Sequence, residues 1–133
     1  MKEKKGLLIV GHGSRSQEAR DTFEETVQLV RRTGEYSLVE GAHMELAQPS
    51  IPEMVEKLAA EQVDEIIVVP YFLYKGIHIK KDIPQIMKEL SNKYPRINFK
   101  LGEPIGAEPI FTRILLNRAR EALDFRSVKV RGQ

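Results

Sequence analysis

The sequence predicts an α/β fold with a doubly wound, mostly parallel four-stranded sheet and helices on both faces. Short apolar segments alternate along the chain with amphipathic segments of helical periodicity, and no long loop interrupts them. The apolar segments lack the polar–apolar alternation of a half-exposed strand, which is typical of strands that are covered on both faces. We expect the flavodoxin-like strand order 2-1-3-4, in which ligands bind at the carboxyl ends of the strands.

The first strand is predicted over residues 6–11, GLLIVG, because these residues are apolar without alternation. A helix is predicted over residues 16–32, since its apolar positions share one stripe, and Gly34 stops it. Ser14 and Gln17 have the spacing of a capping box, so we expect Ser14 to cap this helix.

A second strand and helix are predicted next. Residues 36–46 are less uniformly apolar, which favours an edge strand. Ser50 and Glu53 have the spacing of a capping box, and Pro52 suits the first turn of a helix that ends near Gln62.

The third predicted strand, over residues 64–73, is the most hydrophobic segment of the chain. After a loop, Asp82 and Gln85 again have capping-box spacing, and Pro84 falls in the first turn. This helix is predicted to end near residues 92–95, NKYP.

A short fourth strand over residues 97–103 and a last helix over residues 108–123 complete the predicted fold. We expect one domain over residues 1–124, because a chain of 133 residues suits a single core. Residues 125–133 are expected to form a flexible tail.

The composition excludes several classes of site and partner. The chain has no cysteine, which rules out disulfides, zinc–thiolate centres and thiol nucleophiles. The net charge is +2, which argues against a general nucleic-acid binder. The apolar run near the amino terminus is too short for a signal peptide or a membrane span. We therefore expect a cytoplasmic protein that binds neither nucleic acid nor membranes.

Three chemically capable side chains are predicted at the carboxyl ends of adjacent strands. His12 follows the first strand, Glu45 lies at the end of the second, and His78 lies in the loop after the third. Two imidazoles and a carboxylate suit a divalent first-row metal, and without thiolates such a site stays labile. His43 shares the strand parity of Glu45 and is expected to face the same side, in a structural role.

Each of these residues also has a plainer interpretation. His12 by itself fits a helix cap, His78 fits a solvated loop, and Glu45 fits an exposed charge. The hypothesis of a metal site depends on the whole set, because unrelated residues would not gather at one edge of a sheet.

The segment GHGSR, residues 11–15, also favours an anion. Ser14 and Arg15 lie where the first helix begins, so exposed amides and the helix dipole meet a guanidinium group that can pair with a carboxylate or a phosphate. The chain has no P-loop pattern for ATP, and this segment lacks the third glycine of a dinucleotide fingerprint.

The loop after the third strand is both apolar and basic. Residues 71–79, YFLYKGIHI, carry aromatic and aliphatic side chains in a segment that is expected to be partly exposed, and lysines follow it. A planar ligand with an acidic rim, or another subunit, would cover such a surface. The basic residues between 75 and 100 also fit a solvated helix face.

Four segments together resemble the small sirohydrochlorin cobaltochelatases, a family of class II chelatases of cobalamin biosynthesis. They are LLIVGHGSR, MELAQPSIPE, IIVVPYFLYKGIHIKKDIP and GEPIG, which run in order between Gly6 and Gly106. The resemblance implies a metal-inserting lyase that acts on the acidic tetrapyrrole sirohydrochlorin without ATP. It further implies a short form that builds its cleft as a homodimer and has no cofactor beyond its substrate metal.

The resemblance assigns the metal to His12 and His78 and makes Glu45 a further catalytic residue. We expect one imidazole to accept a pyrrole proton as the metal leaves, and Glu45 to orient an imidazole or to take the second proton. The remaining site residues are expected to bind the substrate. They are Ser14, Arg15, Tyr74, Lys75, Gly76, Lys80 and Lys81.

Cobalt is the metal expected from the resemblance alone. Related chelatases insert iron or nickel, and imidazole and carboxylate ligands do not choose among Co²⁺, Fe²⁺ and Ni²⁺. Two other functions fit parts of the sequence. One is a non-catalytic carrier of metal or tetrapyrrole, and the other is a histidine phosphatase, although Gly11 stands where a phosphatase has arginine before its histidine.

Overall fold

A computed structural model describes residues 3–124, apart from the side chains of His78 and Ile79. Four strands form one sheet in the order β2-β1-β3-β4, and every neighbouring pair is parallel. The predicted fold class and strand order are therefore confirmed. The strands are β1 (Lys5–Gly11), β2 (Leu38–His43), β3 (Glu65–Pro70) and β4 (Asn98–Leu101).

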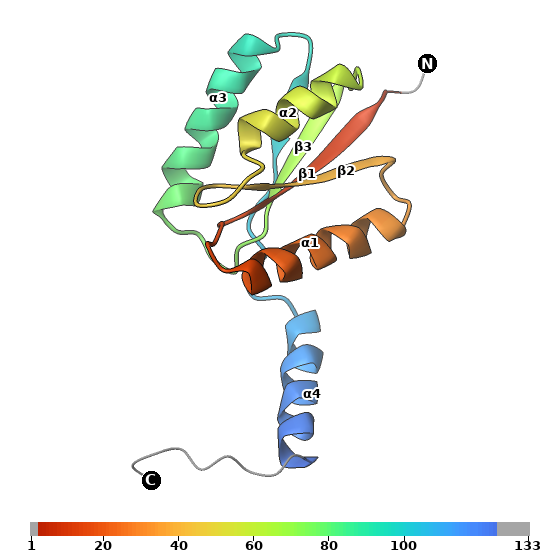
Figure 1. Ribbon diagram of the computed structural model, residues 1–133, viewed down its shortest axis with the longest axis vertical. Helices are drawn as coiled ribbons and strands as arrows, with labels where there is room; N and C mark the ends of the chain where they lie inside the picture. Colours follow the sequence, from red (N-terminus) through yellow and green to blue (C-terminus); the bar gives the residue numbers. More distant parts are fainter. Residues whose placement is uncertain (1–2, 125–133) are drawn as a thin grey trace.

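Helices cover both faces of the sheet, as predicted (Figure 1). One face carries α1, and the opposite face carries α2 and α3. A π-helical turn, η1, leads directly into α3, and a last helix follows β4. The helices are α1 (Gln17–Arg32), α2 (Ile51–Ala60), η1 (His78–Asp82), α3 (Ile83–Lys93) and α4 (Ile110–Asp124).

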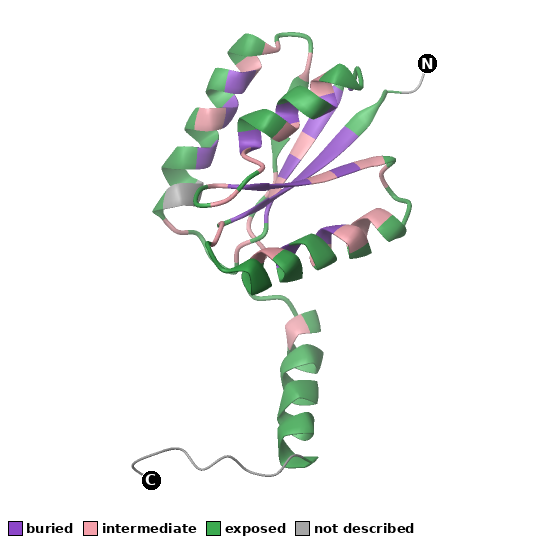
Figure 2. Cartoon of the chain, in the orientation of Figure 1, coloured by how far each residue is buried: buried purple, intermediate pink, exposed green. Residues whose placement is uncertain are grey.

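The core consists of two layers, one on each face of the sheet. In β1, Leu7 and Ile9 pack toward α1, whereas Leu8 and Val10 pack toward α2 and α3. This central strand is apolar at successive positions because both of its faces are covered. The buried residues accordingly concentrate along the middle of the sheet (Figure 2). Burying one such aliphatic side chain contributes about 1.5–3 kcal/mol.

The predicted capping box of α2 is confirmed. The Glu53 amide donates to Ser50 Oγ at 3.3 Å, and the Ser50 amide donates to Glu53 Oε1 at 2.9 Å. Pro52 lies in the first turn, as predicted, and needs no hydrogen-bond partner for its nitrogen there. The capping box and Pro52 therefore define the first turn of α2, directly after the loop that follows β2.

Two other predicted helix caps are wrong, although α1 and α3 begin where they were predicted to within one residue. Ser16, not Ser14, caps α1, because Ser16 has extended backbone angles and its Oγ accepts from the Ala19 amide at 3.3 Å. Ser14 lies two residues earlier, where its Oγ accepts from the Ser16 amide. Asp82 makes no capping hydrogen bond, because η1 runs straight into α3 and Asp82 is itself in a helical conformation.

The last helix, α4, extends away from the sheet and has no buried residue (Figures 1 and 2). Its existence was predicted, and its observed bounds differ from the predicted ones by two residues or fewer. The single domain over residues 1–124 stays a prediction, and the predicted tail over residues 125–133 lies outside the described residues. Within residues 3–124, no helix is both long enough and apolar enough to cross a membrane.

Candidate functional site

The candidate site lies at the carboxyl edge of the sheet, where three loops meet. Because β1 pairs in parallel with both β2 and β3, the segments that follow these strands leave the sheet side by side. His12 comes directly after β1, Glu45 lies two residues beyond β2, and residues 71–77 follow β3.

A close backbone approach joins the first two of these loops. The Met44 amide donates to the Gly11 carbonyl oxygen at 2.9 Å. Gly13 has φ of 100°, and a Cβ atom at this position would collide with the carbonyl oxygen of Glu45. Residue 13 must therefore be glycine. Other residues rarely adopt this positive φ, and any Cβ atom would overlap the Glu45 carbonyl oxygen. The approach places His12 beside Glu45.

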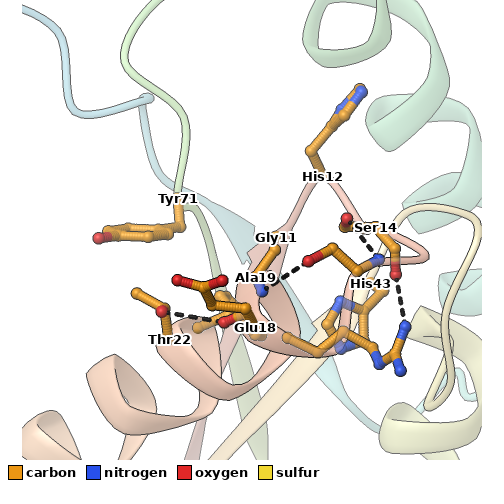
Figure 3. A pocket seen from close by; sticks show the side chains of 12 residues that line it. Gly11, His12, Ser14, Glu18, Ala19, Thr22, His43 and Tyr71 are labelled. Atoms are coloured by element: carbon orange, nitrogen blue, oxygen red, sulfur yellow. Dashed lines mark hydrogen bonds between the residues drawn. The ribbon is translucent and has the colours of Figure 1, made fainter.

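His12 and Glu45 form an exposed imidazole–carboxylate pair. His12 Nε2 lies 4.0 Å from Glu45 Oε1, and the two side chains are 57% and 48% exposed. Phe72, from the loop after β3, meets the His12 ring edge to face at a centroid distance of 5.6 Å. Figure 3 shows the imidazole pointing away from α1. The pair is therefore open to a metal ion or a large ligand from solution.

The third predicted ligand, His78, is the first residue of η1. Its backbone follows the loop after β3, the strand beside β1, but its side chain lies outside the described part of the structure. Among the described side chains, no group of three or more His, Cys, Asp or Glu residues is arranged to hold a metal ion. Of the three predicted site residues, the described side chains therefore bring only His12 and Glu45 together.

A cavity of about 530 Å³ adjoins the loop that carries His12 (Figure 3). The ends of β1, β2 and β3 and the first turns of α1 form its wall. Of the lining residues, the sequence predicts a binding role only for His12 and Ser14, because helix periodicity and strand parity do not show which side chains enclose a space. The remaining lining residues are Gly11, Gly13, Ser16, Glu18, Ala19, Arg20, Thr22, Phe23, His43 and Tyr71.

His43 forms part of the cavity wall and is only 7% exposed. The parity argument that paired it with Glu45 does not apply, because β2 ends at His43 and the chain then bends, with Leu46 at φ of 64°. Its ring packs on Phe23 at a centroid distance of 5.0 Å. Burial, followed by the positive charge of Arg20, lowers the pKa of His43, and Glu24 partly opposes this shift. His43 is thus neutral at neutral pH.

The amino-terminal turn of α1 is held by Arg20. Its guanidinium group donates to the Ser14 carbonyl oxygen at 3.0 Å and to Gln17 Oε1 at 2.7 Å. These bonds fix Ser14 in the cavity wall, whereas the neighbouring Arg15 is exposed. An exposed basic residue therefore lies in the segment just before α1, close in sequence to the amides of the helix start.

Two of the three predicted lysines line a different cavity. Lys75 and Lys80 line a second cavity of about 320 Å³ beside the β4–α4 connection, where Lys75 Nζ lies 2.8 Å from Glu103 Oε2. The Gly76 carbonyl oxygen accepts from the Lys80 amide at 3.2 Å. Tyr74 is 77% exposed, and Lys81 is also exposed. The apolar loop after β3 is therefore open to a partner, as its sequence predicted.

The four-stranded parallel sheet, with helices on both faces and an exposed His–Glu pair at its carboxyl edge, defines a doubly wound α/β protein, and comparison with known proteins identifies its family. The family model for CbiX matches residues 6–122. The chain belongs to the CbiX family.

Individual relatives agree with this assignment. The sirohydrochlorin cobaltochelatase of Sulfurisphaera tokodaii is 38% identical over 89% of this chain and 93% of its own length. The chloroplastic sirohydrochlorin ferrochelatase of Arabidopsis thaliana is 31% identical over 89% of this chain and 52% of its own. The crystal structure of the sirohydrochlorin chelatase SirB from Bacillus subtilis subspecies spizizenii, in complex with cobalt, superposes with a TM-score of 0.85 at 28% identity. The match covers 89% of this chain and 50% of SirB.

Replacing Gly13 by alanine should destabilise the fold and weaken Co²⁺ binding. A positive φ costs a residue with a Cβ about 1–3 kcal/mol, and the clash with the Glu45 carbonyl group adds to this cost. Urea denaturation and Co²⁺ titration measure the two effects. Gly102→Ala is the matched control, because a Cβ there meets only ordinary contacts. Equal stability and Co²⁺ affinity in the two variants would contradict the role of the close approach.

Replacing His43 by glutamine should flatten the dependence of stability on pH. Because folding lowers the pKa of His43 below the unfolded value of 6.5, the unfolded chain binds more protons in acid. The native protein should therefore lose stability as the pH falls through 6.5 toward the lowered pKa. Urea midpoints at pH 7.5 and pH 5 should move closer together in His43→Gln than in the wild type. If the two urea midpoints differ by as much in His43→Gln as in the wild type, His43 does not cause the loss of stability between pH 7.5 and pH 5.

Proposed function

We propose that this protein is a sirohydrochlorin cobaltochelatase, an enzyme that inserts Co²⁺ into sirohydrochlorin without ATP. The observation that carries the proposal is the exposed pair of His12 and Glu45, 4.0 Å apart at the carboxyl edge of the sheet of a CbiX-family chain. The names of the relatives support the same reaction.

The reaction exchanges one divalent cation for the two pyrrole N–H protons of the macrocycle. It therefore needs groups that hold the cation and groups that accept protons. In our proposal His12 and His78 present the metal, and one of these imidazoles, once free of it, accepts a proton. Glu45 lies close enough to His12 to orient its ring or to take the second proton.

We further propose that the exposed loop after β3 binds the tetrapyrrole. Tyr74 and the neighbouring apolar side chains offer a surface for the planar ring, and Gly76 gives the backbone room beside it. The basic residues would pair with the peripheral carboxylates, with Lys75 exchanging its present partner, Glu103, for the substrate. With the amide-lined start of α1, the assigned substrate-binding residues are Ser14, Arg15, Tyr74, Lys75, Gly76, Lys80 and Lys81.

The metal is a substrate of this reaction, and we propose cobalt. The name of the Sulfurisphaera relative and the cobalt complex of SirB support it, whereas the Arabidopsis relative is named for iron. We also propose that two copies of the chain form the active dimer, because the apolar loop after β3 lies uncovered on one copy. A cytoplasmic location stays a prediction from the sequence.

Replacing either His12 or His78 by alanine should lower the rate of Co²⁺ insertion at least about 100-fold, because each variant lacks one proposed metal ligand and one possible general base. The visible bands of sirohydrochlorin, followed in the presence of Co²⁺, measure the reaction. Lys88→Ala, on the exposed side of α3, is the control and should react like the wild type.

Wild-type turnover in the double variant of His12 and His78 would overturn the roles of these two residues. Conversion of a single equivalent of sirohydrochlorin by the wild type would overturn the enzyme and identify a carrier. No spectral change at all would exclude both functions.

Equal free concentrations of Co²⁺, Fe²⁺ and Ni²⁺ should yield mainly the cobalt product. Imidazole and carboxylate ligands bind all three ions, so a preference must come from the geometry of transfer and not from ligand type. Anaerobic competition, with the products quantified by mass spectrometry, measures it. A majority of iron or nickel product would reassign the metal and leave the tetrapyrrole reaction standing.

A further inference from the structure

The cavity of about 530 Å³ beside His12 contains a buried histidine, His43, that the proposed reaction does not use. His43 is only 7% exposed, and its ring nitrogens have no hydrogen-bond partner within residues 3–124. Among these residues, no fully buried side-chain nitrogen or oxygen lacks a partner, so the nitrogens of His43 are open to the cavity that it lines. A water molecule or a ligand atom must therefore complete the hydrogen bonding of this ring.

An aromatic wall holds the His43 ring in place. The Phe23 ring contacts it at a centroid distance of 5.0 Å and contacts the Tyr71 ring at 6.0 Å. Phe23 lies directly against the sheet, because a Cβ atom at Gly11 would come within 2.9 Å of its ring and one at Gly41 within 3.0 Å. Glycine at these two strand positions gives the aromatic ring room beside the backbone. The cavity wall behind His43 is therefore closely packed.

The charges around the cavity favour an anion at its base. Arg20 lies close enough to His43 for its positive charge to lower the pKa of this histidine, and it is anchored to the Ser14 carbonyl oxygen. The amides of the first turn of α1 face the same space, and the helix dipole adds positive potential there. Glu18 also lines the cavity, but it is exposed, so water screens its charge. The neutral His43 ring supplies one N–H donor to this positive environment.

The rest of the wall favours an aliphatic stem behind the anionic group. Ala19, Phe23 and the ring of Tyr71 present carbon atoms to the cavity. A ligand group that fits is a carboxylate on one or two methylene groups, whose stem packs on the apolar wall while its oxygens reach His43. Peripheral carboxylates of a tetrapyrrole are carried on such carboxyalkyl arms. The volume of about 530 Å³ is enough for one arm and the edge of the ring that bears it.

The position of the cavity suits an arm of a macrocycle that is bound at His12. His12 is itself a lining residue, and its imidazole points away from α1 (Figure 3). A macrocycle held at this imidazole has its edge at the mouth of the cavity. Lys75 and Lys80 line a different cavity beside the β4–α4 connection. Contacts at two separate places would fix how the macrocycle is turned above the metal ligands.

We propose that the cavity binds one carboxyalkyl arm of the tetrapyrrole, with the His43 ring donating a hydrogen bond to the carboxylate of this arm. The inference rests on the proposed function and adds His43 to its substrate-binding residues. Because the arm lies at the periphery of the macrocycle, this hydrogen bond is made before and after metal insertion alike. Its loss should therefore weaken binding of the tetrapyrrole without slowing the insertion step.

NMR spectroscopy tests the site directly, because the chain has only three histidines and therefore three sets of imidazole signals. Propionate, which represents the arm without the macrocycle, is titrated into the metal-free protein at constant pH and ionic strength. The His43 signals, identified by their loss in His43→Phe, should shift and saturate. Propionamide, the uncharged analogue, should need at least about ten times the concentration for the same shift. An equal response to both probes, or no saturable shift of His43, would overturn the carboxylate site.

A pair of variants tests the hydrogen bond in the reaction. His43→Phe keeps a ring against Phe23 but removes the N–H donor, so the KM for sirohydrochlorin should rise about tenfold while kcat stays within about twofold. His43→Gln restores a side-chain N–H donor and should recover most of the lost affinity. A purely structural role would instead lower the thermal midpoint and impair both variants alike. Equal KM values in His43→Phe and the wild type would refute the hydrogen bond. If His43→Phe does not fold, signals assigned in His43→Gln let the propionate titration decide.

The propionate titration contains neither sirohydrochlorin nor cobalt, so its outcome is separate from that of the proposed function. A saturable His43 shift in a chain that turns over no cobalt would remove the enzyme assignment and leave the carboxylate site standing. Turnover by a wild-type protein whose His43 signals ignore propionate would do the reverse.

Discussion

The parallel pairing of β1 with both β2 and β3 is the constraint on which the candidate site depends. It makes three separate loops leave the sheet at one edge, and it puts the loop after β1 in the middle. The close approach of Gly13 to the Glu45 carbonyl group then fixes how two of these loops meet. Without that approach His12 and Glu45 would merely share an edge. With it, a half-exposed imidazole and a carboxylate lie within reach of the same ligand.

The site combines a well-packed sheet edge with an exposed loop surface. Below the edge, apolar strands are covered on both faces, and Arg20 fastens the start of α1 to the Ser14 carbonyl group. Above it, the loop after β3 exposes aromatic and aliphatic side chains between lysines. A large, flat, acidic substrate needs this combination, since metal transfer requires fixed ligands while the macrocycle requires an accessible surface.

The strands, the α-helices and one helix cap were predicted from local patterns, whereas two other predicted caps were wrong. The Ser50 capping box is a short-range pattern in which both hydrogen bonds join residues three apart, so the sequence alone predicted it. The predicted caps at Ser14 and Asp82 had similar spacing but failed. Gly13 turns the backbone ahead of Ser14, and η1 makes Asp82 helical before it can act as a cap. Spacing does not reveal such conformations, which depend on contacts with other segments.

By itself, the sequence determined the order of strands and helices, the parallel sheet and the clustering of His12, Glu45 and the loop of His78 at one edge. Hydrophobic periodicity and the geometry of crossovers act along the chain, and they suffice for these features. Only the tertiary structure decided the 4.0 Å separation of His12 and Glu45, the burial of His43 in a cavity wall and the exposure of α4. These features arise between segments that are distant in sequence, where the packing of one surface on another, or its absence, leaves no local pattern.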